Sequence, residues 1–359
     1  MGKKSIVIIT KPQFGYHTDY FKYAYYLRKF FNITFICWDH GLKKKYIPNI
    51  EIEYINISKI KQLNFALFII RTIRLLKRKE LDLILIKYFP LSSLIKLALL
   101  KYRFILDIRT GSVNPNNLIR YLKNLLLKVE SLLFDNVTII SEELGRYLKI
   151  KAKNLNVVPL GSEFDDIKNK KFDEINLLYV GTFFNRRIED TIIGYKRFLD
   201  KIVDKTKTRY TIIGYGSVVD ENLIKNTIIK LSLEKFVKFI GRIPNDELDY
   251  YYERHNIGIS YIPITPYYNY QPPTKTFEYL MNGMICIATN TYANKKIINS
   301  NNGVLCDDNS QSFYEALNNL KDRLEKKYNF IVNNSLHQYK WENIVTNKLK
   351  PIISKLLNY

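Results

Sequence analysis

Apolar and polar residues follow two patterns that alternate along the chain. Short apolar runs rich in Ile, Val and Leu are separated by longer segments in which apolar residues recur every three or four positions. The first pattern indicates buried strands, and the second indicates amphipathic helices. In the first half we expect strands at 5–10, 33–37, 51–55, 83–86, 104–107, 136–140 and 156–158, with helices at 19–31, 60–79, 91–102, 117–134 and 142–148.

The second half repeats this alternation. We expect strands at 176–180, 210–213, 237–240, 257–260 and 285–288, with helices at 188–202, 221–231, 246–254 and 275–282. Because strands and helices alternate in both halves, the pattern predicts an α/β fold with two doubly wound, Rossmann-like parallel sheets. We expect the junction in the polar stretch 161–173, domains spanning 1–165 and 166–338, and a final amphipathic helix that begins at Trp341 and runs to Leu357.

One segment, 271–283, places a cation and a carboxylate at the start of a predicted helix. Pro272–Pro273 lie before this helix because proline does not fit a helix interior, and Thr274 is the predicted N-cap. Free N–H groups at the helix start, together with Lys275, suit an anion. Glu278 follows one turn later and suits a group with hydroxyl donors. The segment therefore predicts a nucleotide site, with a diphosphate at the helix start and ribose hydroxyls on Glu278.

This segment resembles the donor-site motif of GT-B glycosyltransferases of family 4, whose pattern is P-x-K-x-x-E-Y-L-x-x-G. By the resemblance, Thr274, Lys275 and Glu278 bind a nucleotide sugar, and Glu278 holds the ribose. Many members carry another Glu eight residues earlier, in the pattern Glu-x7-Glu, where this chain has Tyr270. The alternative interpretation is a capped, half-buried helix after a proline turn.

A second resemblance lies after the first strand of the second half. There the chain passes from Gly181 and Thr182 into the basic pair Arg186–Arg187. In family 4 a Gly-Arg-x-x-x-x-Lys turn at this place holds the donor diphosphate with its two cations. Arg187 matches the lysine, Thr182 replaces the arginine, and we expect Arg186 to compensate. A guanidinium matches a diphosphate well, although a solvated helix start would also explain the pair.

Two further turns follow in the order typical of the family. Gly214 and Gly216 come after the next predicted strand and resemble the family's Gly-x-Gly turn. After the strand that follows, the sequence Gly-Arg-Ile-Pro contains Arg242 and Ile243, where relatives place the nucleotide base. Gly-x-Gly turns are common at tight strand-to-helix connections, so their order along the chain counts for more than either turn alone.

The first half offers fewer motifs. The loop after its first strand contains Gly15, Tyr16 and His17, which we expect near the interdomain cleft and the acceptor. Asp107 and Arg109 end a later strand, and some relatives carry a similar Asp-x-Arg near the reacting sugar or acceptor. We therefore predict a catalytic role for both. A structural Asp–Arg pair at a strand end is the alternative.

The composition bears on compartment and partners. The formal net charge is +22, which favours an anionic partner or reflects a general excess of Lys. The three cysteines are far apart and show no metal-ligand or disulfide spacing, so we expect a reducing cytoplasm and no metal. No signal peptide or spanning helix is expected. The basic amphipathic stretch 68–79 is a candidate for lying on an anionic membrane.

Together the resemblance implies a retaining, metal-independent glycosyltransferase of the hexosyltransferase type, with no cofactor. Its donor is expected to be a UDP-sugar, bound by the second domain, and its acceptor a glycan or lipid-linked molecule, bound by the first. Arg187 and Lys275 are expected to stabilise the departing diphosphate. The implied role is polysaccharide or glycoconjugate biosynthesis, in the cytoplasm or at the inner membrane face, and the last helix (339–359) is expected to cross back to the first domain.

Three alternatives stay open at this point. A UDP-sugar 2-epimerase has the same fold but needs acidic and histidine catalytic residues that the pattern does not place. A basic nucleic-acid-binding protein would explain the charge of +22, but the charge is dispersed and no binding motif is present, so no nucleic acid is expected. A relative that binds the donor without turnover would explain the departures at Thr182 and Tyr270.

Overall fold

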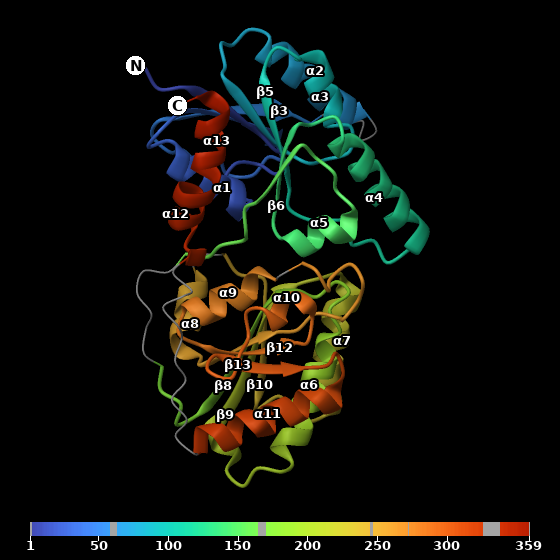
Figure 1. Ribbon diagram of the computed structural model, residues 1–359. Coiled ribbons are helices and arrows are strands. Elements are labelled where there is room, and N and C mark those ends of the chain that lie inside the picture. The colour runs from blue at the N-terminus through green and yellow to red at the C-terminus, as the bar shows by residue number, and fades with distance from the viewer. Residues whose placement is uncertain are drawn as a thin grey trace. The chain divides into compact units, whose positions relative to one another are not determined.

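The computed structural model describes residues 2–57, 63–163, 170–244, 247–271, 273–325 and 338–358. The chain forms two compact units, Met1–Gly161 together with Gln338–Tyr359, and Ser162–His337 (Figure 1). Each unit contains one sheet in which all paired strands are parallel. The predicted α/β fold with two Rossmann-like sheets is confirmed. The expected boundary between residues 165 and 166, and Pro272 of the donor motif, lie outside the described residues.

The sheet of the first unit has seven strands in the order β3-β2-β1-β4-β5-β6-β7. The strands are β1 Ser5–Ile9, β2 Asn32–Asp39, β3 Ile50–Asn56, β4 Leu83–Lys87, β5 Arg103–Ile108, β6 Asn136–Ile139 and β7 Asn154–Val157. The helices are α1 Thr18–Leu27, α2 Asn64–Leu76, α3 Ser93–Ala98, α4 Asn117–Ser131 and α5 Glu142–Leu148. The strand order changes direction between β1 and β4, as in a doubly wound sheet.

The C-terminal segment packs on this first unit beside α1, as Figure 1 shows. Trp341 is fully buried, and its ring lies against Tyr23 of α1 with the centroids 6.0 Å apart. The expected single helix is interrupted, because α12 (Trp341–Ile344) and α13 (Lys350–Leu357) are joined by a π-helical turn, Val345–Leu349. This turn ends just before Pro351, whose missing N–H cannot continue regular α-helical hydrogen bonding.

The sheet of the second unit has six strands in the order β10-β9-β8-β11-β12-β13. The strands are β8 Ile175–Thr182, β9 Thr208–Tyr215, β10 Val237–Gly241, β11 Ile257–Ser260, β12 Ile285–Thr289 and β13 Gly303–Cys306. The helices are α6 Ile188–Leu199, α7 Val218–Lys230, α8 Leu248–Arg254, α9 Thr274–Met281, α10 Tyr292–Lys295 and α11 Ser310–Glu325. The sequence patterns did not predict β13, α10 or α11.

Two observations bear on the expected membrane contact. No helix in the described part of the chain is long and apolar enough to span a bilayer. Helix α2, which carries most of the basic stretch 68–79, turns Phe68, Ile69 and Leu76 into the protein. Its main apolar residues are therefore already covered, and the stretch does not offer the apolar surface that was expected of it.

Candidate functional site

The sheet of the second unit has a topological switch point between β8 and β11. From β8 the chain proceeds to β9 and β10 on one side, and β11 to β13 lie on the other. Open α/β sheets bind ligands beyond the carboxyl ends of the strands at such a point. The loop after β8 carries Arg186 and Arg187, and the loop after β11 leads to α9 with Lys275 and Glu278. The fold thus brings two of the predicted motifs to the same edge of the sheet.

Helix α9 begins at Thr274, whereas the sequence pattern predicted that the helix begins at residue 275. Its N-cap is Pro273, in an extended conformation with φ −71° and ψ 132°. The prediction of Thr274 as the N-cap is therefore wrong, because proline's restricted φ lets Pro273 fill that place without contributing a side-chain cap. No described side chain caps α9. The first turn of the helix consequently keeps N–H groups that can bind an anion.

Three side chains converge at this helix. Tyr252 of α8 donates a hydrogen bond from its hydroxyl to Oε2 of Glu278 over 2.7 Å. Lys275 Nζ contacts the same Oε2 and lies 3.2 Å from the Tyr252 hydroxyl. The side chains of Lys275 and Glu278 are each one quarter exposed. The other oxygen of Glu278, Oε1, has no hydrogen-bond partner in the described part of the chain, so it is available to a ligand hydroxyl.

The protonation of Tyr252 is set by its surroundings. Burial, reinforced by the negative charge of Glu278, raises the pKa of Tyr252 well above its usual range. The hydroxyl therefore stays protonated at neutral pH and serves as a donor to the carboxylate. Sequence reasoning missed Tyr252, and a signal for it was weak, since it is one of several tyrosines in the run 250–252.

Arg187 lies at the N-terminus of α6 as its N-cap residue, in the left-handed conformation with φ 53°. Its Nη2 is 2.7 Å from Oδ2 of Asp190, and its Nη1 is 3.9 Å from Oδ2 of Asp308. Tyr261, directly after β11, also donates to Oδ2 of Asp190 over 3.2 Å. Since half of the Arg187 side chain is exposed, the guanidinium is oriented by carboxylates and still reaches solvent.

The neighbouring Arg186 connects the two loops of the switch point. Its guanidinium lies over the ring of Tyr268, 4.4 Å from the centroid, and Tyr268 belongs to the loop between β11 and α9. Asn185 precedes it with φ 52°, and its buried Nδ2 has no partner among the described residues. The side-chain amide of Asn185 therefore has a free donor at the candidate site. The sequence patterns did not predict a role for Asn185.

The glycine turns allow strands β8 and β9 to approach each other. A Cβ built on Gly214 would lie 1.8 Å from the carbonyl oxygen of Gly181, so no other residue fits there. A Cβ on Gly216 would lie 2.8 Å from the Cβ of Asp220 on α7. These glycines are required by packing whether or not they touch a ligand.

The carbonyl of Thr182 accepts a hydrogen bond from the Tyr179 hydroxyl over 2.7 Å.

The last predicted donor residues follow β10. The guanidinium of Arg242 lies 4.6 Å from the ring centroid of Tyr215, the last residue of β9. Arg242 is exposed, whereas Ile243 is partly buried. The stacked pair places a flat, cationic surface at the carboxyl ends of β9 and β10, next to the switch point.

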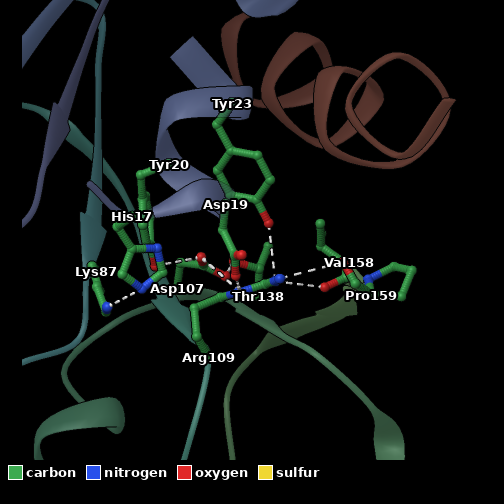
Figure 2. A network of polar contacts seen from close by, with 10 residues as sticks. All are labelled: His17, Asp19, Tyr20, Tyr23, Lys87, Asp107, Arg109, Thr138, Val158 and Pro159. Carbon is green, nitrogen blue, oxygen red and sulfur yellow. Dashed lines mark hydrogen bonds and ion pairs between the residues drawn. The ribbon is translucent and has the colours of Figure 1, made fainter. Parts of the chain in front are cut away.

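In the first unit, Asp107 and Arg109 belong to a buried polar network (Figure 2). Asp107, fully buried, accepts hydrogen bonds from the Tyr20 hydroxyl at 2.6 Å and from Thr138 Oγ1 at 2.7 Å. Burial raises the pKa of Asp107. Arg109 Nε donates to Asp19 over 2.7 Å.

Both terminal nitrogens of Arg109 also donate within the protein. Its Nη1 donates to the Tyr23 hydroxyl at 3.0 Å and to the Val158 carbonyl at 2.7 Å, and its Nη2 to the Pro159 carbonyl at 3.3 Å (Figure 2). The network thus ties β5 to α1 and to the segment after β7. The geometry matches the structural alternative for this pair more closely than a direct contact with substrate.

His17 lies beside this network and pairs with a residue that the sequence did not single out. Its Nε2 is 2.6 Å from Nζ of Lys87, the last residue of β4 (Figure 2). Burial, followed by the charge of Lys87, lowers the pKa of His17 to about 4, and burial lowers the pKa of Lys87 to about 8. A neutral His17 therefore accepts a hydrogen bond from a charged Lys87 at neutral pH. Its buried Nδ1 has no partner among the described residues.

The rest of the predicted loop is more exposed. Gly15 adopts φ 86°, and a Cβ there would lie 2.4 Å from the side chain of Lys45. Tyr16 is 44% exposed and donates to the Lys43 carbonyl over 3.0 Å. The loop therefore brings His17 to the carboxyl edge of the sheet, where Lys87 ends β4, and leaves Tyr16 at the surface.

Comparison with known proteins agrees with this arrangement. Residues 162–336 match the model of the family described as glycosyl transferases group 1. The second unit is similar to glycosyl transferases group 1 over almost its whole length. The protein is a glycosyltransferase, and its two units have the GT-B fold. No curated protein matches the chain in sequence.

Several solved structures share the fold over the whole chain. Sucrose-phosphate synthase from Thermosynechococcus elongatus is 15% identical, with a TM-score of 0.79 and coverage of 99% of this chain and 100% of that one. HepE from Anabaena, in complex with UDP, is 11% identical, with a TM-score of 0.72 and coverage of 98% and 100%. The lipopolysaccharide outer core galactosyltransferase WaaB is 16% identical, with a TM-score of 0.69 and coverage of 98% and 99%.

In this glycosyltransferase the predicted residues form two groups. The second unit gathers Arg186 and Arg187, the α9 residues and the glycine turns at one edge of its sheet. The first unit gathers His17, Asp107 and Arg109 at the carboxyl edge of its own sheet. The described residues contain no cluster of His, Cys, Asp and Glu side chains suited to a metal ion.

Proposed function

We propose that this protein is a retaining, metal-independent hexosyltransferase that moves a sugar from a UDP-sugar to a glycan or lipid-linked acceptor. The observation that carries the proposal is the cluster of Tyr252, Lys275 and Glu278 at the uncapped start of α9, beside the switch point. It combines an oriented carboxylate with a free oxygen, a cation and backbone donors, which is what a ribose next to a diphosphate requires.

In the proposed donor complex, Oε1 of Glu278 accepts hydrogen bonds from the ribose hydroxyls. Lys275 turns from Glu278 toward the diphosphate and acts there with Arg187. Both cations stabilise the negative charge that grows on the leaving diphosphate as the glycosidic bond breaks. Thr274 and the turns at Gly181, Thr182, Gly214 and Gly216 complete the binding surface for the donor, with Arg186 beside the diphosphate.

We place the nucleotide base near Arg242 and Ile243. The Arg242–Tyr215 stack provides a flat surface at the ends of β9 and β10, and planar groups stack well on such a surface. The choice of uridine is supported by the solved structures. HepE has been determined with UDP and with UDP-glucose, and a trehalose-6-phosphate protein from E. coli with UDP-2-fluoro-glucose.

For the acceptor we propose the carboxyl edge of the first unit's sheet. Gly15, Tyr16 and His17 lie there, and Lys87 adds a cation with a lowered pKa. Asp107 and Arg109 act in this proposal as positioning residues, because their network holds α1 and therefore His17 in place. The first unit thus provides the acceptor domain and the second the donor domain.

The location follows from the same proposal. All three cysteines are buried and free, which fits a reducing cytoplasm. A lipid-linked acceptor would bring the enzyme to the inner face of a membrane, as a peripheral protein in polysaccharide or glycoconjugate synthesis. No nucleic acid is part of this proposal. The net charge of +22 also suits anionic sugars and lipids, and the sequence has no motif for reading or stacking nucleic-acid bases.

Calorimetric titration tests the donor site directly. UDP, GDP, UDP-glucose, UDP-galactose and an oligonucleotide are titrated into the wild type and Glu278→Gln, with Glu315→Gln on the exposed side of α11 as the control. We expect binding of one uridine nucleotide that weakens at least tenfold in Glu278→Gln only. Binding unchanged by EDTA supports metal independence, and the anomeric coupling constant of the product, measured by NMR, tests retention.

Other outcomes select the alternatives. UDP-N-acetyl sugar converted without an acceptor identifies an epimerase. Donor binding with no turnover on any glycan or lipid acceptor identifies a degenerate relative. Oligonucleotide binding without nucleotide binding would remove the glycosyltransferase mechanism proposed for this site.

A further inference from the structure

Helix α4, Asn117–Ser131, exposes its apolar face to solvent, whereas a helix that packs on a core buries that face. The residues at 118, 122, 125, 129 and 132 recur at the spacing of one helix face, and all are apolar. They are also all exposed, with Leu118 at 66%, Leu122 at 53%, Leu125 at 39%, Val129 at 52% and Leu132 at 55%. Tyr121 lies at the edge of this stripe and is 63% exposed.

The face of α4 that contacts the protein contains one buried apolar residue, Leu127, beside polar side chains. Glu130 is 3% exposed, and its carboxylate accepts hydrogen bonds from the backbone N–H of Leu91 at 2.6 Å and from Ser92 Oγ at 3.4 Å. Asn124 accepts a hydrogen bond from the Ser112 N–H over 2.8 Å. Core-packed helices show the reverse distribution. Polar anchors therefore hold α4 on the unit while its apolar face is turned outward.

Helix α3 is bonded to the segment that follows α4 and exposes further leucines. Nζ of Lys96 contacts the carbonyl of Leu133, which connects the two helices. Leu94, Leu97 and the following Leu100 are exposed to 43%, 49% and 70%. We call the exposed apolar residues of both helices the leucine face: Leu94, Leu97, Leu100, Leu118, Leu122, Leu125, Val129 and Leu132.

The charges around the leucine face are mainly positive. Lys101, Lys123 and Lys128 form no ion pair with a described residue. Asp107 and Glu130, the carboxylates between residues 91 and 134, are buried, and the exposed Asp135 that follows lies 3.7 Å from Lys96. Apolar residues flanked by lysines and a tyrosine are the composition of helices that lie in the interface of an anionic membrane.

We propose that the leucine face docks the first unit on an anionic lipid bilayer, with α4 lying in the plane of the interface. Its 15 residues give a helix about 22 Å long, enough for four turns of contact. A second copy fits this face less well, because a twofold interface would bring the same unpaired lysines toward each other. Nucleic acid offers no apolar partner to the leucines.

This inference gives the lipid-linked acceptor of the proposed function a route to the enzyme, but its test does not depend on that function. It replaces stretch 68–79 as the membrane contact, since the main apolar residues of α2 are buried. The sequence pattern predicted a helix at 117–134 but did not indicate that its apolar residues face outward.

The test is co-sedimentation with vesicles of phosphatidylcholine, with and without 30% phosphatidylglycerol. We expect the wild type to bind the anionic vesicles, and Leu122→Gln/Val129→Gln to bind them at least tenfold more weakly, because the apolar burial is lost. Lys123→Gln/Lys128→Gln should lose on the order of 30-fold on anionic vesicles, from ~1 kcal/mol per lysine. The matched control is Leu223→Gln/Ile229→Gln on α7, whose side chains are 47% and 60% exposed, and it should bind as the wild type does.

Three results would overturn the proposal. One is equal binding of wild type and Leu122→Gln/Val129→Gln. Another is wild-type binding that is absent or indifferent to phosphatidylglycerol. The third is light scattering that shows a wild-type dimer which Leu122→Gln/Val129→Gln converts to a monomer, because a second copy would then cover the face. UDP titration of the same variant separates this question from the donor site, since it should match the wild type.

Discussion

Tyr252 holds Glu278 through a hydrogen bond of 2.7 Å that crosses from α8 to α9. The phenol is almost entirely buried, and its raised pKa keeps it a donor at neutral pH. One carboxylate oxygen is thereby fixed, and the other is left for a ligand. Orientation of this kind lowers the cost of ordering the carboxylate when the donor binds.

Replacing Tyr252 with Phe should therefore weaken donor binding without removing a group that touches the donor. A hydrogen bond to a charged acceptor contributes about 1.5–3 kcal/mol, so we expect UDP to bind roughly 10- to 150-fold more weakly. Calorimetry measures the change. Tyr250→Phe, which alters a 54% exposed side chain on the same helix, is the control. Equal affinities of Tyr252→Phe and the wild type would show that Glu278 needs no such support.

Arg187 should act mainly on the rate of transfer. In Arg187→Ala we expect kcat to fall by about 10²–10³, the usual effect of removing one stabilising group from a developing anion. Arg187→Lys should recover part of the loss, because an ammonium supplies the charge but not the planar fork. Arg197→Ala, on the same helix but exposed and bonded to Gln311, should leave kcat unchanged. A change confined to KM would instead assign Arg187 to ground-state binding.

The network around Arg109 predicts a large effect on stability. Arg109→Met leaves the buried carboxylates of Asp19 and Asp107 without their cation, and such losses cost about 3–5 kcal/mol. Both tryptophans, Trp38 and Trp341, belong to the first unit, so their fluorescence in urea follows that unit's unfolding. Arg146→Met, at a side chain 71% exposed, is the control.

A second readout separates this role from catalysis. Since UDP is proposed to bind the second unit, Arg109→Met should bind UDP as the wild type does at low urea. If Arg109→Met is as stable as the wild type and loses turnover instead, the positioning role is wrong and direct contact with the reacting groups is favoured.

These buried partners mark what the sequence could and could not predict. Asp107 and Arg109 stood out because charged residues ended an apolar strand, but their partners Asp19, Tyr20 and Tyr23 lie almost 90 positions earlier. Burial and pairing over that separation depend on how α1 packs on β5, which no local pattern contains. The sequence therefore left the structural and catalytic interpretations of the pair open.

The elements themselves were easier to predict where the pattern was long. The strands from β1 to β12 follow apolar runs and were predicted to within a few residues. β13 was missed because only four residues pair there, at the edge of the sheet. α11 was missed although Phe313, Leu317 and Leu320 recur at helical spacing, because polar residues dominate the segment around them.

The pair of His17 and Lys87 makes stability depend on pH in a defined direction. The pKa of His17 is about 4 in the folded protein and 6.5 in an unfolded chain, so between these values the unfolded state binds more protons. The contribution of His17 to stability should then be complete above pH 6.5 and decline as the pH falls toward 4, by on the order of 2–3 kcal/mol. His17→Gln should reduce this decline in tryptophan-monitored urea unfolding, and His40→Gln, at an exposed position, should not.

The charge of Lys87 is one cause of the lowered pKa of His17, so the pH effect has a second and sharper test. Removing it in Lys87→Gln should raise the pKa of His17 toward its ordinary value, although burial keeps part of the shift. Proton NMR of the imidazole C2–H resonances, assigned by their loss in His17→Gln, follows the titration of this residue alone. If the pKa of His17 is the same in Lys87→Gln and in the wild type, burial alone lowers it and the contact over 2.6 Å has no electrostatic consequence.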